Sequence, residues 1–95
     1  REGEDRAGDS AATDVARALA LTLGRMGARD SAERLAARVL DARRAAHGPW
    51  HPLVGVALND LGELRWQAGD FDSSAALIER ALAVARRARA DTALL

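Results

Sequence analysis

The stretch from His51 to Leu82 reads HPLVGVALNDLGELRWQAGDFDSSAALIERAL and decides the fold of this 95-residue chain. Apolar residues recur every three or four positions on both sides of Gly69-Asp70, a pattern that predicts two amphipathic helices joined by a tight turn. Pro52 fits the first turn of the first helix, where a missing N–H costs nothing. A turn this short makes the two helices pack antiparallel as a hairpin.

The same pattern occurs in weaker form 42 residues earlier in the chain. Identical residues at this offset are Gly27 and Gly69, Leu19 and Leu61, Asp30 and Asp72, Ser31 and Ser73, Leu35 and Leu77, Arg38 and Arg80, Leu40 and Leu82, and Arg44 and Arg86. An internal repeat of this length, made of helical hairpins, is typical of a helical solenoid. The predicted fold class is therefore all-α, an alpha-alpha superhelix of two antiparallel hairpins plus the start of a fifth helix.

Capping and helix-ending residues predict the boundaries of the elements. The polar residues 1–9 are expected to form a flexible N-terminal tail. Helices are expected over about 10–26, 31–47, 52–68 and 71–89, with a capping box at Asp30-Ser-Ala-Glu33 and an Asp70 cap. Repeat 1 then covers about 10–48 and repeat 2 about 52–90, and residues 91–95 begin a truncated third repeat.

Gly62 falls in the middle of the third predicted helix, where it costs about 1 kcal/mol relative to Ala. We therefore expect a neighbouring helix to approach closely at this position. At the end of the array, Leu82 and Val84 are expected to leave an apolar face on the fourth helix. Such a face predicts that the chain forms a homodimer, swaps, or stacks end to end.

Composition excludes several classes of function. All 14 basic residues are Arg and they balance 14 acidic residues, so the chain lacks the positive charge of a general nucleic-acid binder. There is no Cys for a disulfide or a thiolate site, and no apolar run long enough to cross a membrane. We expect a cytoplasmic fragment of a longer bacterial protein, its Ala and Arg content reflecting a GC-rich genome.

Three groups of residues carry the resemblance to a known family: Gly48-Pro49-Trp50-His51-Pro52, Leu58-Asn59-Asp60-Leu61-Gly62 and Gly69-Asp70-Phe71. From Ser10 to Ala90 the chain resembles the tetratricopeptide repeat (TPR), and in particular the 42-residue kinesin-light-chain-like variety. It departs from the usual pattern at Arg65, where Tyr is common, at Ser74, where Ala is common, and at Arg29, which replaces the aromatic residue in the first unit. The resemblance implies a right-handed stack of hairpins whose first helices line a concave groove for a partner's peptide or helix.

The repeat register of this resemblance places eight residues at the groove. The peptide-binding candidates are Arg17, Leu21, Arg25, Asn59, Asp60, Glu63, Trp66 and Gln67. Asn can bond a peptide backbone through its donor and its acceptor, Arg can form two hydrogen bonds to a carboxylate, and Trp can pack against an apolar side chain of the ligand. The alternative is that these residues are merely solvated and that Trp66 packs on a neighbour.

Other groups of reactive residues have simpler explanations. His47 and His51 have the spacing of a helical metal pair, but Gly48-Pro49 separates them and no third ligand is near. Asp70 and Asp72 lie at a helix start, where acids stabilise free amides. The basic runs 43–44 and 86–89 are interleaved with acids or lie at helix ends. We therefore expect no catalytic residue, cofactor, metal, nucleic acid or membrane.

Two functions remain open from the sequence. The first is a non-enzymatic protein-interaction module, a scaffold or sensor segment that binds a peptide or helix in its groove. The second is a structural segment that stacks repeats into a homo-oligomer and has no external ligand.

Overall fold

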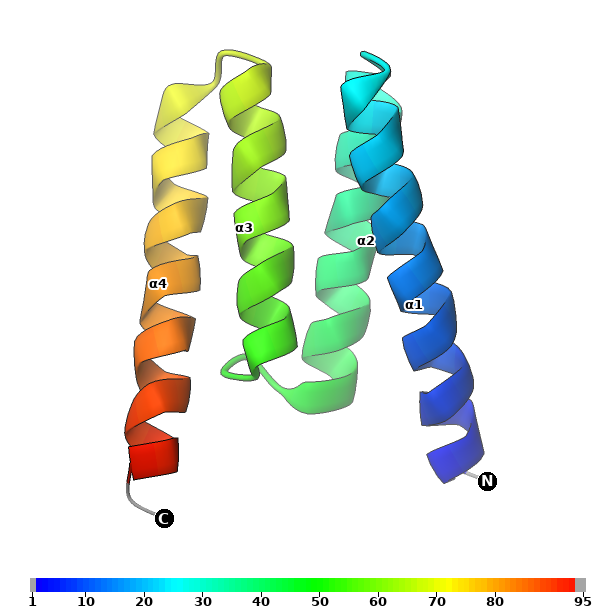
Figure 1. Cartoon of the computed structure of the whole chain (residues 1–95), viewed down its shortest axis with the longest axis vertical. Helices are drawn as coiled ribbons and strands as arrows, with labels where there is room; N and C mark the ends of the chain where they lie inside the picture. Colours follow the sequence, from blue (N-terminus) through cyan, green and yellow to red (C-terminus); the bar gives the residue numbers. More distant parts are fainter. Residues whose placement is uncertain (1, 94–95) are drawn as a thin grey trace.

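A computed structural model describes the backbone of residues 2–93 and the side chains of residues 11–92. This part of the chain consists of α1 (Glu2–Arg25), α2 (Arg29–His47), α3 (Pro52–Gln67) and α4 (Phe71–Ala93), and it contains no strand. Helices α1 and α2 form one antiparallel hairpin and α3 and α4 form the other, with α2 packed against α3 between them (Figure 1). The predicted all-α repeat fold is confirmed.

The two hairpin turns have the same backbone structure, 42 residues apart. Gly27 and Gly69 have φ of 85° and 84°, in the left-handed region that favours glycine. In each turn the residue after the glycine donates its N–H to a carbonyl five residues earlier, Ala28 to Leu23 and Asp70 to Arg65, both at 2.9 Å. This bond closes the helix end and turns the chain sharply, so the internal repeat holds at the level of single hydrogen bonds.

The hairpins are joined by a linker that caps α3. The backbone N–H of Leu53 donates to Nδ1 of His51 at 3.1 Å, and Pro52 occupies the first turn as predicted. The rings of His47 and His51 stack with their centroids 4.2 Å apart. These contacts satisfy a free amide at the start of α3 and fix the direction in which the second hairpin leaves the first.

The core lies between α2, α3 and their partners. Its buried residues are Ala20, Ala32, Ala36, Val39, Leu40, Val54, Ala57, Leu58, Leu61, Leu64 and Val84. Small residues let the helices approach closely: a Cβ on Gly62 would lie 2.9 Å from Cγ1 of Ile78 in α4. This distance confirms the close approach predicted at Gly62.

Three expected helix ends are corrected. Helix α1 begins at Glu2 instead of about Ser10, since the sequence before Ser10 contains no Pro that would stop the helix. The expected flexibility of residues 1–9 stays a prediction. Helix α2 begins at Arg29, and the expected capping box does not form, because Ala28 takes the capping position without a side-chain bond.

Helix α4 continues to Ala93, so residues 91–93 do not start a fifth helix, and residues 94–95 lie outside the described part. No Gly or Pro interrupts residues 86–93, and Oγ1 of Thr92 donates to the carbonyl of Ala88 at 2.9 Å. Val84 was expected on an open face, but it is buried, and its Cγ1 would lie 3.2 Å from a Cβ on Gly55. Leu82 does remain exposed.

Candidate functional site

A hollow of about 340 Å³ lies between the first helices of the two hairpins. It is lined by Arg17, Leu21 and Arg25 of α1 and by Asn59, Asp60, Glu63, Leu64 and Gln67 of α3. The lining residues of α1 are four positions apart, and those of α3 (59, 60, 63, 64 and 67) repeat at three or four positions, so each set shares one helix face. Seven of the eight groove candidates therefore surround a single hollow.

A charged pair crosses the hollow and joins α1 to α3. Nε of Arg17 donates to Oδ2 of Asp60 at 2.5 Å, and Nη2 donates to Oδ1 at 3.2 Å. The carboxylate raises the pKa of Arg17 above its ordinary value, although partial burial acts in the opposite direction. Asp60 is 7% exposed, so its main contact is this internal pair, which fixes the distance between the two lining helices.

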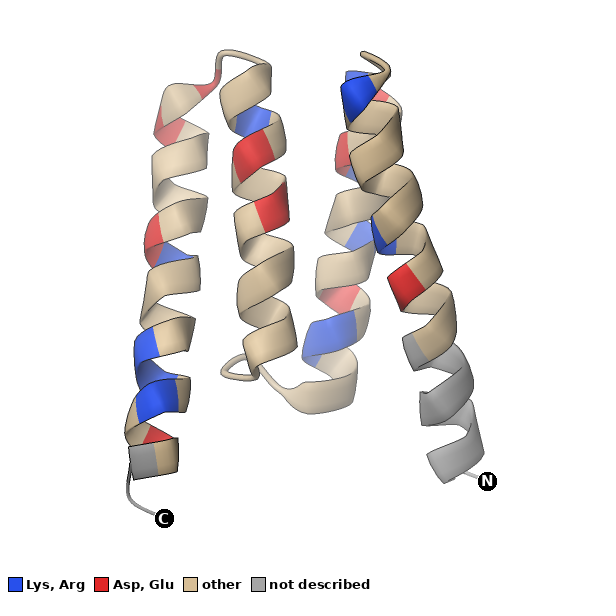
Figure 2. Cartoon of the chain, in the orientation of Figure 1, with Lys and Arg blue, Asp and Glu red and all other residues tan. Residues whose placement is uncertain are grey.

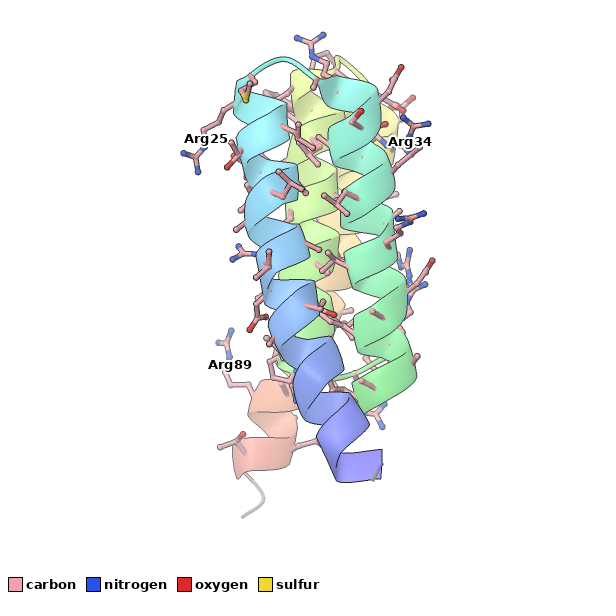
Figure 3. All side chains as sticks on the ribbon, turned by 90° about the vertical axis from the view of Figure 1, so that its right-hand side faces the viewer. Arg25, Arg34 and Arg89 are labelled. Atoms are coloured by element: carbon pink, nitrogen blue, oxygen red, sulfur yellow. The ribbon has the colours of Figure 1, made fainter. Side chains whose placement is uncertain are left out.

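Four polar side chains of the lining point to solvent. Arg25, Asn59, Glu63 and Gln67 are exposed, and no hydrogen bond or ion pair is found for them among the described residues. Figure 3 shows Arg25 projecting from one side of the helix array and Arg34 from the opposite side. The exposed group offers one positive charge, one negative charge and two amides, which are the groups needed to bond a peptide backbone and a charged side chain.

Trp66 is the groove candidate that the structure places elsewhere. Its ring packs on the ring of Phe71, with centroids 4.7 Å apart, beside the Gly69-Asp70 turn. It does not line the hollow and is 61% exposed. The position of Trp66 therefore agrees with the alternative given in the sequence analysis, in which this side chain packs on a neighbouring residue and does not face the groove.

Leu64 lines the hollow but was not among the sequence candidates. It is 4% exposed and forms an apolar floor between the polar residues. Its spacing of four from Asp60 and three from Gln67 puts it on the same helix face. That spacing was the available signal, but an apolar residue in this position is equally typical of the core.

The histidine pair has a structural role. Burial lowers the pKa of His51 below its ordinary value, and the neighbouring His47 and Arg43 lower it further. The neutral ring is the form that can accept the hydrogen bond from Leu53. Among the described residues no group of three or more His, Cys, Asp or Glu side chains is placed to hold a metal ion.

The other charged groups that the sequence singled out lie at helix ends and junctions. Oδ1 of Asp70 accepts the backbone N–H of Ser73 at 3.3 Å, and hydrogen bonds from Ser73 lower the pKa of Asp70. Arg43 is buried, donates to the carbonyl of Leu53 at 3.0 Å and pairs with Asp14 at 3.4 Å. The guanidinium of Arg87 lies over the ring of Trp50, 4.9 Å from its centroid.

Comparison with known proteins agrees with this architecture. A family model described as tetratricopeptide repeat matches residues 9–87, which is most of the chain. Searches of curated proteins and of solved structures gave no match, and no helix in the described part is long and apolar enough to span a membrane. Repeats of this kind generally mediate protein–protein interaction without enzymatic activity. On the evidence of the matching family model, the two equivalent hairpins and the hollow between their first helices, the chain belongs to the tetratricopeptide repeat family.

Proposed function

We propose that this chain is a protein-interaction module that binds an extended peptide segment of a partner in the hollow between α1 and α3. The observation that carries the proposal is the convergence of side chains from both hairpins. Residues that are about 40 positions apart in the sequence line one hollow, with apolar side chains between exposed polar ones. A site of this kind is typical of peptide recognition, in which backbone bonds supply affinity and apolar contacts add to it.

The charges of the lining define the ligand more closely. Because Arg17 is engaged by Asp60, Arg25 is the free cation of the described lining, and it suits an acidic side chain or a terminal carboxylate. Glu63 suits a basic side chain, and Asn59 and Gln67 suit the peptide backbone. We therefore propose a peptide that carries both an acidic and a basic residue, bound within a scaffold or sensor array of the 42-residue repeat subtype.

The test is peptide binding by the full chain, with a library of fluorescent peptides of mixed charge measured by anisotropy. The double variant Asn59→Ala, Gln67→Ala should weaken a selected peptide by about tenfold or more, because both amide partners are removed. Trp66→Ala is the matched control, since it removes an exposed side chain of α3 outside the hollow. Equal affinity of wild type and the double variant would refute the groove proposal.

The alternative function is a structural segment that stacks repeats and has no external ligand. The observation that favours it is the exposure of Leu19 and Leu82 at the two ends of the array. It predicts that no library peptide binds and that the chain associates only with itself. Peptide binding and self-association would use different surfaces, so the two measurements distinguish the two functions.

A further inference from the structure

The junction between the two hairpins has an exposed counterpart at each end of the array. Residues of α2 and α3 that are buried at this junction recur 42 positions away on α4 and α1, where they are exposed. The exposed fraction rises from 5% at Leu40 to 49% at its counterpart Leu82, and from 7% at Leu61 to 51% at its counterpart Leu19. For the third pair it rises from 1% at Ala57 to 69% at Val15. Because the residues of each pair hold the same place in the repeat, the difference comes from the neighbouring hairpin, which α1 and α4 lack on their outer faces in the described chain.

Charged residues at the internal junction are replaced by apolar ones at the ends. Arg65 pairs with Glu33 across α2 and α3, with 2.9 Å between Nε and Oε1. The counterparts of these residues are Leu23 and Ala75, and the counterpart of the buried Arg43 is Ala85. At these three positions the outer faces have apolar residues in place of the charges, so covering them would bury apolar surface with little loss of hydration of polar groups.

The outer side of the first hairpin also contains an open hollow of about 590 Å³, lined mainly by alanines of α1 and α2. Its counterpart in the second hairpin is about 210 Å³. Arg44, Pro49 and Trp50 from the end of α2 and the linker line it, and larger side chains stand there in place of three alanines of the first hairpin. By the repeat register, the residue of α4 that corresponds to Arg44 is Arg86. The C-terminal half of an α4 from another molecule therefore has the place in the repeat that would cover the open hollow.

Charge complementarity points to the identity of the partner. If the junction is repeated between molecules, α4 lies antiparallel to the next α1, as α2 lies to α3, so the end of α4 meets the start of α1. The last turns of α4 carry Arg86, Arg87 and Arg89 with one acidic residue, Asp91, and Figure 2 shows basic residues concentrated in the lower part of α4. The sequence of residues 2–14 contains five acidic residues and one Arg. Opposite charges at these two ends favour this pairing and oppose the contact of two α4 helices with each other.

We propose that a second copy of this chain packs head to tail on the first, with the outer face of α4 against the outer face of the partner's α1, in the geometry of the α2–α3 junction. The two faces differ, so the contact is heterologous and each added copy leaves a free α4 and a free α1 face. Assembly therefore continues with concentration instead of stopping at a dimer. The proposal does not depend on peptide binding, because the hollow between α1 and α3 lies on another surface.

The test is sedimentation velocity of the wild type and of two single variants, Leu82→Asp and Leu19→Asp. The wild type should grow in mean mass over about two orders of magnitude of concentration. Each variant destroys one of the two faces and should associate at least about thirtyfold more weakly, because a charge replaces a leucine that the contact buries. Mixed in equal amounts, the two variants should form a one-to-one dimer and nothing larger, since each supplies the face that the other has lost.

The matched control is Val56→Asp. Val56 is also an exposed apolar residue, and its counterpart in the first hairpin is already an aspartate, Asp14, so this variant should associate like the wild type. Circular dichroism confirms that each variant keeps its helices; if an Asp variant unfolds, the Gln variant at the same position takes its place. A monomeric wild type, a Leu19 variant that still dimerises, or a mixture that stays monomeric would each overturn the proposal.

Discussion

Gly62→Ala is expected to destabilise the chain, although Ala is the better helix former. In an exposed helix this substitution would stabilise by about 1 kcal/mol. At Gly62 the new Cβ would lie 2.9 Å from Cγ1 of Ile78 and 3.4 Å from both Cβ of Leu77 and the carbonyl oxygen of Ser74. Favourable carbon–carbon contacts lie at about 3.5–4.0 Å, so α3 and α4 must move apart or Ile78 must leave its rotamer.

Overpacking of this kind costs about 1–3 kcal/mol, which exceeds the gain in helix propensity and leaves a net loss of about 1 kcal/mol. For a domain of this size that loss lowers Tm by about 4–8 °C. Thermal unfolding followed by circular dichroism, together with urea denaturation, measures both quantities. Gly55→Ala is the control, because it lies on the same helix and faces α4, but its nearest contact is Val84 Cγ1 at 3.2 Å and the next is at 3.5 Å.

The control should change the free energy of unfolding much less than Gly62→Ala, since propensity and crowding nearly cancel there. A Gly62→Ala variant that is more stable than the wild type would refute the reasoning. It would mean that the two helices separate at no cost and that the close approach at Gly62 does not contribute to the packing of the second hairpin.

Two further predictions concern single polar contacts. Lowering the pH through about 6.5, the ordinary histidine pKa, should reduce stability, because the folded pKa of His51 is lower and the unfolded chain takes up the proton first. The stabilisation from neutral His51 is complete above the pKa of the unfolded chain and is lost as the pH falls through the lower pKa of the folded chain. In His51→Asn the cap does not titrate, so the free energy of unfolding from urea titrations should change less with pH. An unchanged pH dependence would contradict this. Asp60→Asn should cost about 1 kcal/mol, because Arg17 loses a charged partner but stays partly hydrated. A double-mutant cycle with Arg17→Gln should give a coupling of similar size, and additive effects would show that the pair does not link α1 to α3.

The pattern of apolar residues predicted the fold because helix periodicity and left-handed glycines are local signals. Gly27 and Gly69 end helices where expected, and the spacing of four between Arg17, Leu21 and Arg25 placed them on one face. No contact with a distant residue is needed to read these features. The expected helix ends at about residues 10 and 89 were wrong because no strong helix-breaking residue marks them, so the helices continue by one or more turns.

Details of the site depended on partners that a linear pattern does not reveal. The position of Trp66 is decided by Phe71 across a turn, and the burial of Asp60 by an arginine 43 residues away. Val84 is covered because Gly55 opposite it has no side chain. In each case the deciding residue lies on another helix, and the sequence shows only that both are present.

The buried Arg43 has a consequence for the curvature of the array. It donates from the last turns of α2 to the carbonyl of Leu53 in the first turn of α3 and so restrains the angle between the two hairpins, and that angle sets the pitch and radius of a superhelix. Ala85 takes its place in the second hairpin, so a unit docked on α4 has no such latch. A joint formed on α4 is therefore expected to be less restrained in its angle than the internal one, and a long ligand lying along several units is expected to bend the assembly at that joint first.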